Sequence, residues 1–160
     1  MGTNFSIRPA AANEAALLSA LAVRSKGHWG YSKEFLDACR DELAVDLEAV
    51  DVQVAADGDE LLGYYALDDL GAGRFELDAL FVDPPHIGKG IGRALLEHAL
   101  RALAAKGATQ LTIQSDPDAA RFYEAAGARL IGSRASGSIP GRELPLYAID
   151  IGASGERQAG

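Results

Sequence analysis

The sequence predicts an α/β (α+β) fold, in which a mixed, mostly antiparallel sheet of about seven strands carries helices on both faces. Two observations predict it. Segments with strand or helix periodicity follow one another in the order β, α, α, β, β, β, α, β, α, β, β. Several neighbouring strands are joined by tight turns, which makes hairpins, and one strand–helix–strand passage requires a crossover.

The first third of the chain carries one short strand and two helices. Phe5–Arg8 alternates between polar and apolar residues and stops at Pro9, as a short strand does. Ala11–Arg24 is rich in alanine and leucine, which predicts an amphipathic helix. Ser32 is a typical N-cap, so a second helix is expected from there to about Leu43. The apolar faces are expected to be Leu17, Leu18 and Leu21 on the first helix, and Phe35, Leu36, Cys39 and Leu43 on the second.

The middle of the chain changes to a period of two residues. Val50–Ala56 and Leu61–Leu67 are predicted as the two strands of a hairpin, because the Asp57–Gly58 pair between them is a tight-turn signal. A second turn at Gly71–Gly73 leads into a third strand, Phe75–Val82, which ends before two prolines.

The last part of the chain alternates helices and strands. A long helix follows a glycine-rich segment and runs to Lys106, where Gly107 ends it. Gln110–Gln114 is a predicted strand, and Pro117 opens a helix that runs to Ala126. The long helix has the apolar face Leu96, Ala99, Leu100 and Leu103, and the final strands are Ala128–Ser133 and Leu144–Ile151.

Composition limits the classes of function. The length of 160 residues suggests one domain, expected over residues 1–151, with a flexible tail at 152–160. The formal charge of 15 − 23 = −8 argues against a nucleic-acid-binding or polybasic membrane-surface protein. No apolar run approaches the roughly 20 residues that span a bilayer, and no signal peptide is visible, so a cytoplasmic protein is expected. The single cysteine, Cys39, excludes a disulfide framework, and the spacing of His86 and His98 predicts no metal site.

The most informative segment is the glycine-rich stretch Gly88–Gly92, which stands between a strand and a helix. Its three alternate glycines let backbone N–H groups face one point, and together with the helix dipole they make an anion cradle. A Walker loop is excluded because Lys89 is followed by Gly90 and not by serine or threonine. A dinucleotide fingerprint is excluded because Arg93 stands where its last glycine belongs. The alternative is a glycine-rich loop that holds no ligand.

With this loop the chain resembles the GNAT family of CoA-dependent N-acetyltransferases. The family signature is Arg/Gln-x-x-Gly-x-Gly/Ala, entered from a strand that ends in Val-x-Pro. Here Phe81–Pro84 supplies the entry, and Gly90 and Gly92 supply the glycines, but Ile87 replaces the leading Arg or Gln. A second signature, Asn-x-x-Ala-x-x-x-Tyr-x-x-x-Gly, matches Asp116–Gly127 in spacing, with aspartate in place of asparagine. The resemblance extends over nearly the whole chain outside the tail and implies the acyl-CoA N-acyltransferase (GNAT) fold.

The resemblance implies acetyl-CoA as the co-substrate, bound where the fourth and fifth strands splay apart. The pantetheine would pair with the backbone of Leu80 and Val82, and the diphosphate would meet the amides of Ile87–Gly92. Lys89 and Arg93 are equally typical of a solvated helix start, and Asp116 of a helix cap. The implied cofactor-binding residues are Leu80, Phe81, Val82, Ile87, Gly88, Lys89, Gly90, Ile91, Gly92, Arg93, Asp116, Ala119 and Phe122.

The implied chemistry is direct acyl transfer to an amine, which must lose a proton before it attacks. Glu76 and Asp78 share one face of the predicted strand Phe75–Val82. Either carboxylate, or an ordered water, is therefore a candidate base. The alternative for both residues is a solvent-facing strand carboxylate. Tyr123 occupies the position of the family tyrosine that protonates the leaving thiolate; otherwise it is a half-buried helix tyrosine packing beside Phe122.

The resemblance places the acceptor pocket at Lys26–Tyr31 and Ser136–Arg142. The predicted substrate-lining residues are His28, Trp29, Tyr31 and Arg142. Ordinary packing of loops onto the core is the alternative. The expected acceptor is an amine of a small molecule or peptide, with no nucleic-acid or membrane partner, and a homodimer formed through exposed late strands is left open. A transferase that uses a different acyl-CoA and a non-catalytic CoA-binding sensor domain are the other hypotheses.

Overall fold

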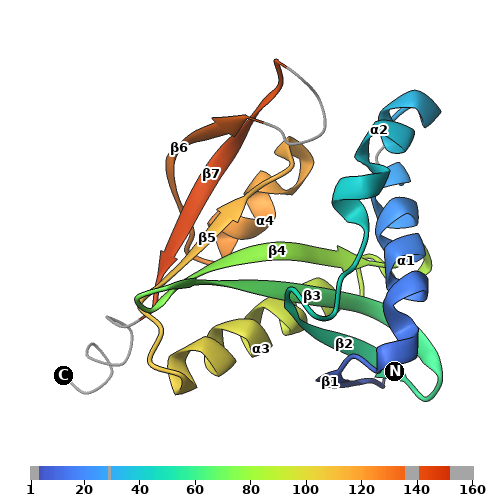
Figure 1. The fold of residues 1–160 in the computed structure, drawn as a ribbon, viewed down its shortest axis with the longest axis horizontal. Helices are drawn as coiled ribbons and strands as arrows, with labels where there is room; N and C mark the ends of the chain where they lie inside the picture. The colour runs from blue at the N-terminus through green and yellow to red at the C-terminus, as the bar shows by residue number, and fades with distance from the viewer. Residues whose placement is uncertain (1–3, 29, 136–140, 152–160) are drawn as a thin grey trace. The chain divides into compact units, whose positions relative to one another are not determined.

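The computed structural model describes residues 4–28, 30–135 and 141–151 (Figure 1). Within these residues the strands and α-helices follow the predicted order, with short 3-10 helices added between them. Seven strands form one sheet in the order β1-β2-β3-β4-β5-β7-β6. The predicted α/β (α+β) sheet is confirmed. The single domain over residues 1–151 stays a prediction, and the tail at 152–160 lies outside the described residues.

The elements lie close to their predicted positions. The strands are β1 (Ser6–Pro9), β2 (Asp51–Asp57), β3 (Glu60–Gly71), β4 (Arg74–Val82), β5 (Gln110–Gln114), β6 (Arg129–Ala135) and β7 (Glu143–Asp150). The helices are α1 (Ala15–Gly27), α2 (Lys33–Leu43), α3 (Ile91–Ala105) and α4 (Ala120–Ala125), with the 3-10 helices η1 (Ala12–Glu14), η2 (Pro84–His86) and η3 (Pro117–Ala119). One difference is in β3, which continues to Gly71 instead of ending at Leu67.

The chain forms two compact units. The first contains the residues up to Leu67 together with Asp78–Ala99, and the second contains Asp68–Leu77 together with the residues from Leu100 onward. Each unit therefore takes part of β4 and part of α3. Among the helices in the described part of the chain, none has the length and apolar character needed to cross a membrane.

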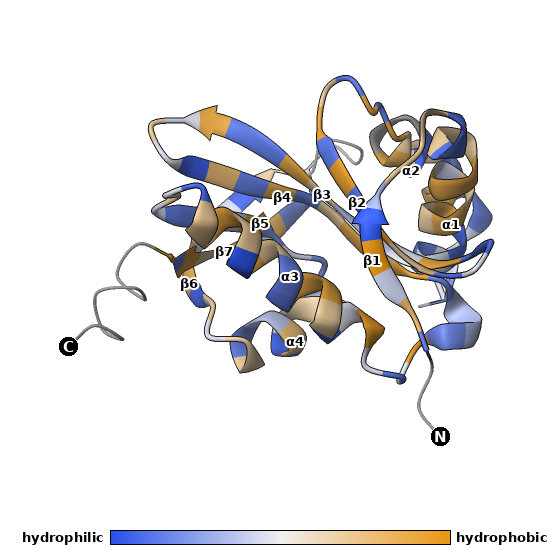
Figure 2. Cartoon of the chain, turned by 90° about the horizontal axis from the view of Figure 1, so that it is seen from below, coloured by the Kyte–Doolittle hydropathy of each residue, from blue (hydrophilic) through white to orange (hydrophobic). Residues whose placement is uncertain are grey.

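In the first unit, β1, β2 and β3 form an antiparallel ladder, which confirms the predicted hairpin. Gly58 at its turn has a φ of 59°, a conformation that glycine adopts without steric cost. The register shifts between Ala55 and Ala56, where β3 accommodates one extra residue as a bulge. Figure 2 shows apolar and polar residues in bands along β2, as expected for a strand with one face against a core.

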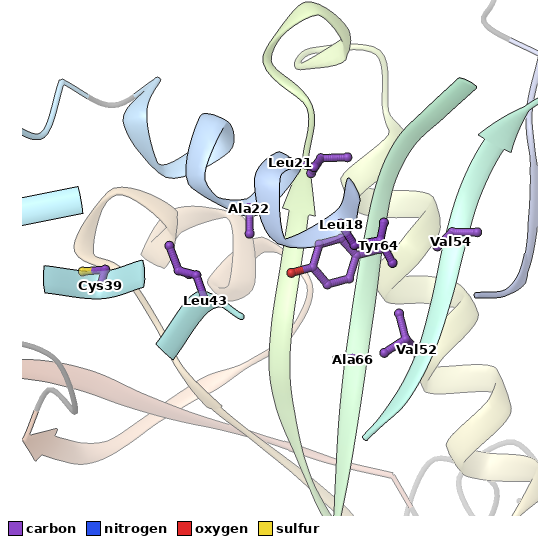
Figure 3. Packing of buried hydrophobic residues seen from close by; sticks show 9 residues of the cluster. All are labelled: Leu18, Leu21, Ala22, Cys39, Leu43, Val52, Val54, Tyr64 and Ala66. Carbon is purple, nitrogen blue, oxygen red and sulfur yellow. The ribbon is translucent and has the colours of Figure 1, made fainter. Parts of the chain in front are cut away.

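Helices cover both faces of this part of the sheet. On one face, Tyr64 of β3 packs with α1 and α2 in the apolar cluster of Figure 3. The buried members of this cluster are Leu18, Leu21, Ala22, Cys39, Leu43, Val52, Val54, Tyr64 and Ala66. Tyr65, the next residue, has its hydroxyl 2.8 Å from Nδ1 of His98 on α3. Because successive strand residues point to opposite faces, these two tyrosines contact helices on opposite sides.

The first helix differs from its prediction in two ways. The segment predicted to be helical from Ala11 begins as the 3-10 helix η1, and α1 continues past Arg24 to Gly27. Leu17 was expected on the apolar face but is 59% exposed, whereas Leu18 and Leu21 are buried. Neighbouring helix positions are 100° apart, so the helix buries Leu18 and leaves Leu17 at the edge of its apolar face.

The second unit is built around β5 and the β6–β7 hairpin. β5 pairs antiparallel with β7, and β7 pairs antiparallel with β6. Arg74–Glu76, the first residues of β4, pair in parallel with Gln110–Thr112 of β5, which makes the sheet mixed. The predicted divergence of β4 and β5 beyond this ladder stays a prediction.

Candidate functional site

The predicted anion cradle is a loop between η2 and α3. Gly88 and Gly90 have φ values of 88° and 82°, and a side-chain carbon placed on either one would meet open space within 4 Å. These positions therefore need glycine for backbone conformation, and their backbone is approachable from outside. The first intrahelical bond of α3 runs from the Ala94 N–H to the Gly90 carbonyl at 3.1 Å. The amides at the start of α3 thus have no carbonyl of their own helix to bind, which suits an anion.

One predicted contact of this loop is already used internally. The Ile87 N–H donates to the Pro84 carbonyl at 3.2 Å and closes η2. The amides that suit a diphosphate therefore start at Gly88 and extend to Arg93 at the beginning of α3. This also fits the apolar side chain at position 87, because the residue contributes neither a cationic side chain nor an available N–H.

The charged side chains of the loop are held by neighbouring groups of the first unit. The Lys89 ammonium donates to Nδ1 of His86 at 3.2 Å, and Nε2 of His86 lies 2.9 Å from a Glu60 carboxylate oxygen. Since an ammonium can only donate, Nδ1 of His86 is the acceptor of this contact, and its Nε2 faces Glu60. Arg93 is 81% exposed and lies 3.4 Å from Glu97 one turn further along α3. Lys89 is thus held against the loop by His86, whereas Arg93 has the surroundings of a solvated helix start.

The end of β4 leads directly into the loop. The Asp83 N–H donates to the Leu62 carbonyl of β3 at 2.8 Å. The Phe81 ring packs against Tyr64, with ring centroids 5.9 Å apart, on the α1–α2 side of the sheet. Leu80 and Val82 then point to the opposite face by the alternation of strand residues. The three strand residues predicted to contact acetyl-CoA thus point to two faces of the sheet, and the Phe81 side chain packs against the apolar core.

Tyr123 is the buried tyrosine of α4, in the second unit. Only 7% of it is exposed, and its ring meets Phe122 edge-on with centroids 5.1 Å apart. Burial raises the pKa of its phenol well above the usual value, and the nearby negative charge of Asp116 raises it further. Its hydroxyl therefore stays protonated over the physiological range and is available as a hydrogen-bond donor or acid.

Asp116 precedes the 3-10 helix η3 that leads into α4, and Ala119 is the last residue of η3. The Ala119 N–H donates to the Asp116 carbonyl at 2.9 Å, and the Ser115 hydroxyl donates to the same carbonyl at 2.7 Å. These contacts involve the Asp116 backbone, so they fix the strand–helix junction that carries Tyr123.

The two candidate bases have different surroundings. A single guanidinium nitrogen of Arg134 on β6 lies 2.9 Å from both carboxylate oxygens of Glu76. Both carboxylate oxygens of Glu76 are therefore occupied by the guanidinium, and Glu76 itself is half-buried. Asp78 is exposed on β4, and its charge helps to raise the pKa of the buried Tyr64.

The predicted acceptor residues are only partly described. His28 is exposed at the C-cap of α1, and its N–H donates to the Arg24 carbonyl at 3.1 Å. Tyr31 stacks on Phe35 of α2 with centroids 4.3 Å apart. Arg142 is half-buried in the second unit. Trp29 and residues 136–140 lie outside the described residues.

Sequence reasoning missed three residues whose side chains form ion pairs with residues of β4 and of the segment that leads from it to the glycine loop. Arg24 pairs with Asp83, Glu60 pairs with His86, and Arg134 pairs with Glu76. Each partner lies far away in the sequence, and the arginines and the glutamate have no local motif around them. No pattern in the sequence would have identified them.

Comparison with known proteins gives a consistent family. The model of the acetyltransferase (GNAT) family matches residues 17–128. The chain is 37% identical over 90 residues to the peptidyl-lysine N-acetyltransferase YjaB of Salmonella typhimurium, covering 56% of this chain and 57% of that protein. It is 36% identical over 84 residues to the N-alpha-acetyltransferase RimI of Mycobacterium tuberculosis, covering 50% of this chain and 52% of that protein. The matches thus span about half the length of these curated relatives.

Solved structures of the same family have a similar fold. The crystal structure of PaiA N-acetyltransferase from Thermoplasma acidophilum, solved in complex with coenzyme A, superposes with a TM-score of 0.73. The match covers 92% of this chain and 99% of that one, at 19% sequence identity. At this identity the similarity establishes the shared fold, and the predicted GNAT fold is confirmed.

Proposed function

Because the chain belongs to the acetyltransferase (GNAT) family, we propose that it transfers an acetyl group from acetyl-CoA to a primary amine. The observation that carries this proposal is the glycine loop, whose two left-handed glycines expose backbone amides at the start of α3. An acidic protein needs such local dipoles to hold a diphosphate, since its net charge of −8 opposes the ligand.

The loop fits the diphosphate of acetyl-CoA through its backbone. The amides from Gly88 to Arg93 would hold the phosphate oxygens, with Lys89 as the cationic side chain within the glycine-rich stretch. The backbone of Leu80 and Val82 would pair with the pantetheine. When bound, acetyl-CoA supplies an acetyl thioester that an uncharged amine attacks directly.

Deprotonation of the amine is the first task of the protein. A primary amine with a pKa near 10.4 is mostly protonated at neutral pH, so a base or an ordered water must accept its proton. We assign this role to Asp78 in preference to Glu76. Asp78 is exposed on β4, where an amine can approach it, whereas Glu76 is half-buried.

Tyr123 is the proposed acid. Its hydroxyl would hydrogen-bond the developing thiolate sulfur and deliver its proton as the bond to the acetyl group breaks. Its raised pKa keeps the proton in place until negative charge develops on sulfur. The hydrogen bond to the charged sulfur is then stronger than any bond it makes to the neutral thioester, which is the condition for catalysis.

The acceptor is proposed to be an amine of a peptide or a small molecule. The relatives named above act on peptidyl-lysine and on α-amino groups, and an acidic surface favours cationic amines of both kinds. His28 and Tyr31 in the first unit, and Arg142 in the second, are the proposed acceptor-lining residues. The exposed β6, which is the last strand of the sheet, would offer the pairing edge for a homodimer.

The test is a transfer assay that follows thiol release. The protein is incubated with acetyl-CoA and, separately, a lysine-containing peptide with a blocked N-terminus, a peptide with a free N-terminus, and a set of small amines. Thiol release with at least one amine, and acetylated product by mass spectrometry, supports the proposal. Tight binding of CoA without thiol release on the whole panel would favour the sensor hypothesis. Release only with longer acyl-CoA donors would favour the alternative donor.

A further inference from the structure

Arg24 forms a two-pronged ion pair across the first unit. It lies in the last turn of α1, and its Nε and Nη2 each donate to one carboxylate oxygen of Asp83 at 3.0 Å. The two residues are 59 positions apart in the sequence. Such a fork fixes both the distance and the orientation of the carboxylate, which a single-point contact does not.

Asp83 is the residue through which β4 enters the glycine loop. Its N–H donates to the Leu62 carbonyl at 2.8 Å, and its carbonyl accepts from the His86 N–H at 2.8 Å. Its side chain is only 17% exposed and is held by Arg24. The N–H and the carbonyl of Asp83 are therefore both held by hydrogen bonds, and its side chain is held by Arg24. The direction in which the chain leaves the strand toward Gly88 depends on all three contacts.

We propose that Arg24 is a positioning residue for the cofactor loop, acting through Asp83. The inference rests on the proposed function, since it assumes that this loop binds the diphosphate of acetyl-CoA. A partly exposed ion pair contributes little to stability, so the fork matters mainly for where the loop amides point. Amides that miss the phosphate oxygens by a fraction of an ångström lose much of their binding energy.

The same turn of α1 leads into the segment expected to line the acceptor pocket. The N–H of His28 donates to the carbonyl of Arg24, so the backbone of Arg24 fixes the helix end while its side chain fixes the loop. One residue thus links the helix end that leads into the acceptor segment to the entry of the cofactor loop.

The chain offers a matched control in the same unit. Arg8 makes an equivalent fork to Glu14, with nitrogen–oxygen distances of 2.9 and 2.8 Å. The exposures are similar, at 37% and 14% for this pair and 52% and 17% for Arg24 and Asp83. The Arg8 pair joins β1 to η1, and neither residue belongs to the glycine loop or the acceptor segment.

The experiment measures CoA binding by calorimetry in the wild type, Arg24→Gln and Arg8→Gln. We expect Arg24→Gln to raise the Kd for CoA roughly tenfold, while Arg8→Gln changes it less than about twofold. Thermal unfolding of each variant reports whether the two substitutions cost similar stability. In the transfer assay, Arg24→Gln should raise the KM for acetyl-CoA and leave kcat at saturation and the KM for the amine nearly unchanged.

Rescue separates a positioning role from a general loss of packing. Arg24→Lys should restore only part of the affinity, because lysine keeps the charge and loses the fork. The double variant Arg24→Asp with Asp83→Arg should bind CoA more tightly than either single variant does. Both residues line an open surface pocket of about 260 Å³, so neither exchanged side chain enters a closed core. If Arg24→Gln does not fold, Arg24→Lys and the exchange carry the test.

Two results would overturn the inference. One is a wild type that binds CoA together with an Arg24→Gln variant whose affinity is unchanged. The other is an equal loss of affinity in Arg24→Gln and Arg8→Gln, which would assign the effect to stability alone. A wild type that does not bind CoA at all refutes the proposed function itself, and that outcome is distinct from both.

Discussion

Gly63 occupies a position where the fold has no room for a side chain. A Cβ at this residue would lie 2.7 Å from the Phe81 carbonyl oxygen, 3.2 Å from the Val82 Cα and 3.3 Å from a Leu95 methyl carbon. The two closest atoms belong to the backbone of β4, which cannot rotate away as a side chain would. A Gly63→Ala substitution must therefore push β3 away from the end of β4.

The expected cost follows from these contacts. Overpacking of this kind costs about 1–3 kcal/mol, and the absence of a flexible neighbour on the carbonyl side places Gly63→Ala in the upper half of that range. The free energy of unfolding, measured by urea denaturation, should fall by about 2 kcal/mol. Because the displaced atoms lie just before the glycine loop, the Kd for CoA should rise as well.

Gly27 provides the matched control. Its added Cβ would lie 3.3 Å from Cδ1 of Leu36, the far end of a flexible side chain that can yield. Gly27 is also the last residue of α1, where alanine is a better helix former than glycine by up to about 1 kcal/mol. Gly27→Ala should therefore be neutral or slightly stabilising. Equal unfolding free energies for Gly63→Ala and the wild type, or an equal loss in Gly27→Ala, would refute the steric argument.

Three further predictions concern the loop, the acid and the pH dependence. Tyr123→Phe should lower kcat about 100-fold and leave the Kd for CoA unchanged, because only the proton donor is lost; an unaltered kcat removes the proposed acid. Gly90→Val should weaken CoA binding about tenfold in calorimetry, because a φ of 82° costs a valine about 1–2 kcal/mol, and unchanged affinity would place the diphosphate elsewhere. The hydrogen bonds from Arg8 lower the pKa of Glu14 from 4.5 to about 2, against the opposing effect of burial. The pair therefore stabilises the fold above pH 4.5 and loses this contribution as the pH falls toward 2. When the free energy of unfolding is measured from pH 4.5 toward pH 2, it should fall by about 1 kcal/mol less in Glu14→Gln than in the wild type. An equal fall in both proteins would contradict this.

The order of elements could be predicted because its signals are local. The two-residue period of β2 and the Gly58 turn lie within one short stretch, as do the Ser32 cap and the apolar face of α2. In the structure the Phe35 N–H donates to the Ser32 hydroxyl oxygen at 3.1 Å, as the cap requires. Interactions of this kind depend on residues a few positions apart, which a sequence displays directly.

Features that depend on distant partners could not be predicted in this way. Leu17 fits the helical period as well as Leu18 does, and only the packing of β3 against α1 decides which of them is buried. The Arg24–Asp83 and Arg134–Glu76 pairs join residues 59 and 58 positions apart. A single sequence has no local signal for such contacts, because the topology of the sheet creates them.

The two candidate bases illustrate how this limit reaches the chemistry. In the sequence, Glu76 and Asp78 differ by one methylene and share one face of a strand, so no argument from spacing separates them. The fold supplies a difference in exposure: Asp78 is exposed, whereas Glu76 is half-buried beside Arg134 of β6. The assignment of Asp78 therefore depends on the strand pairing of the second unit, which brings Arg134 to Glu76, and Arg134→Gln should leave the transfer that relies on Asp78 in place.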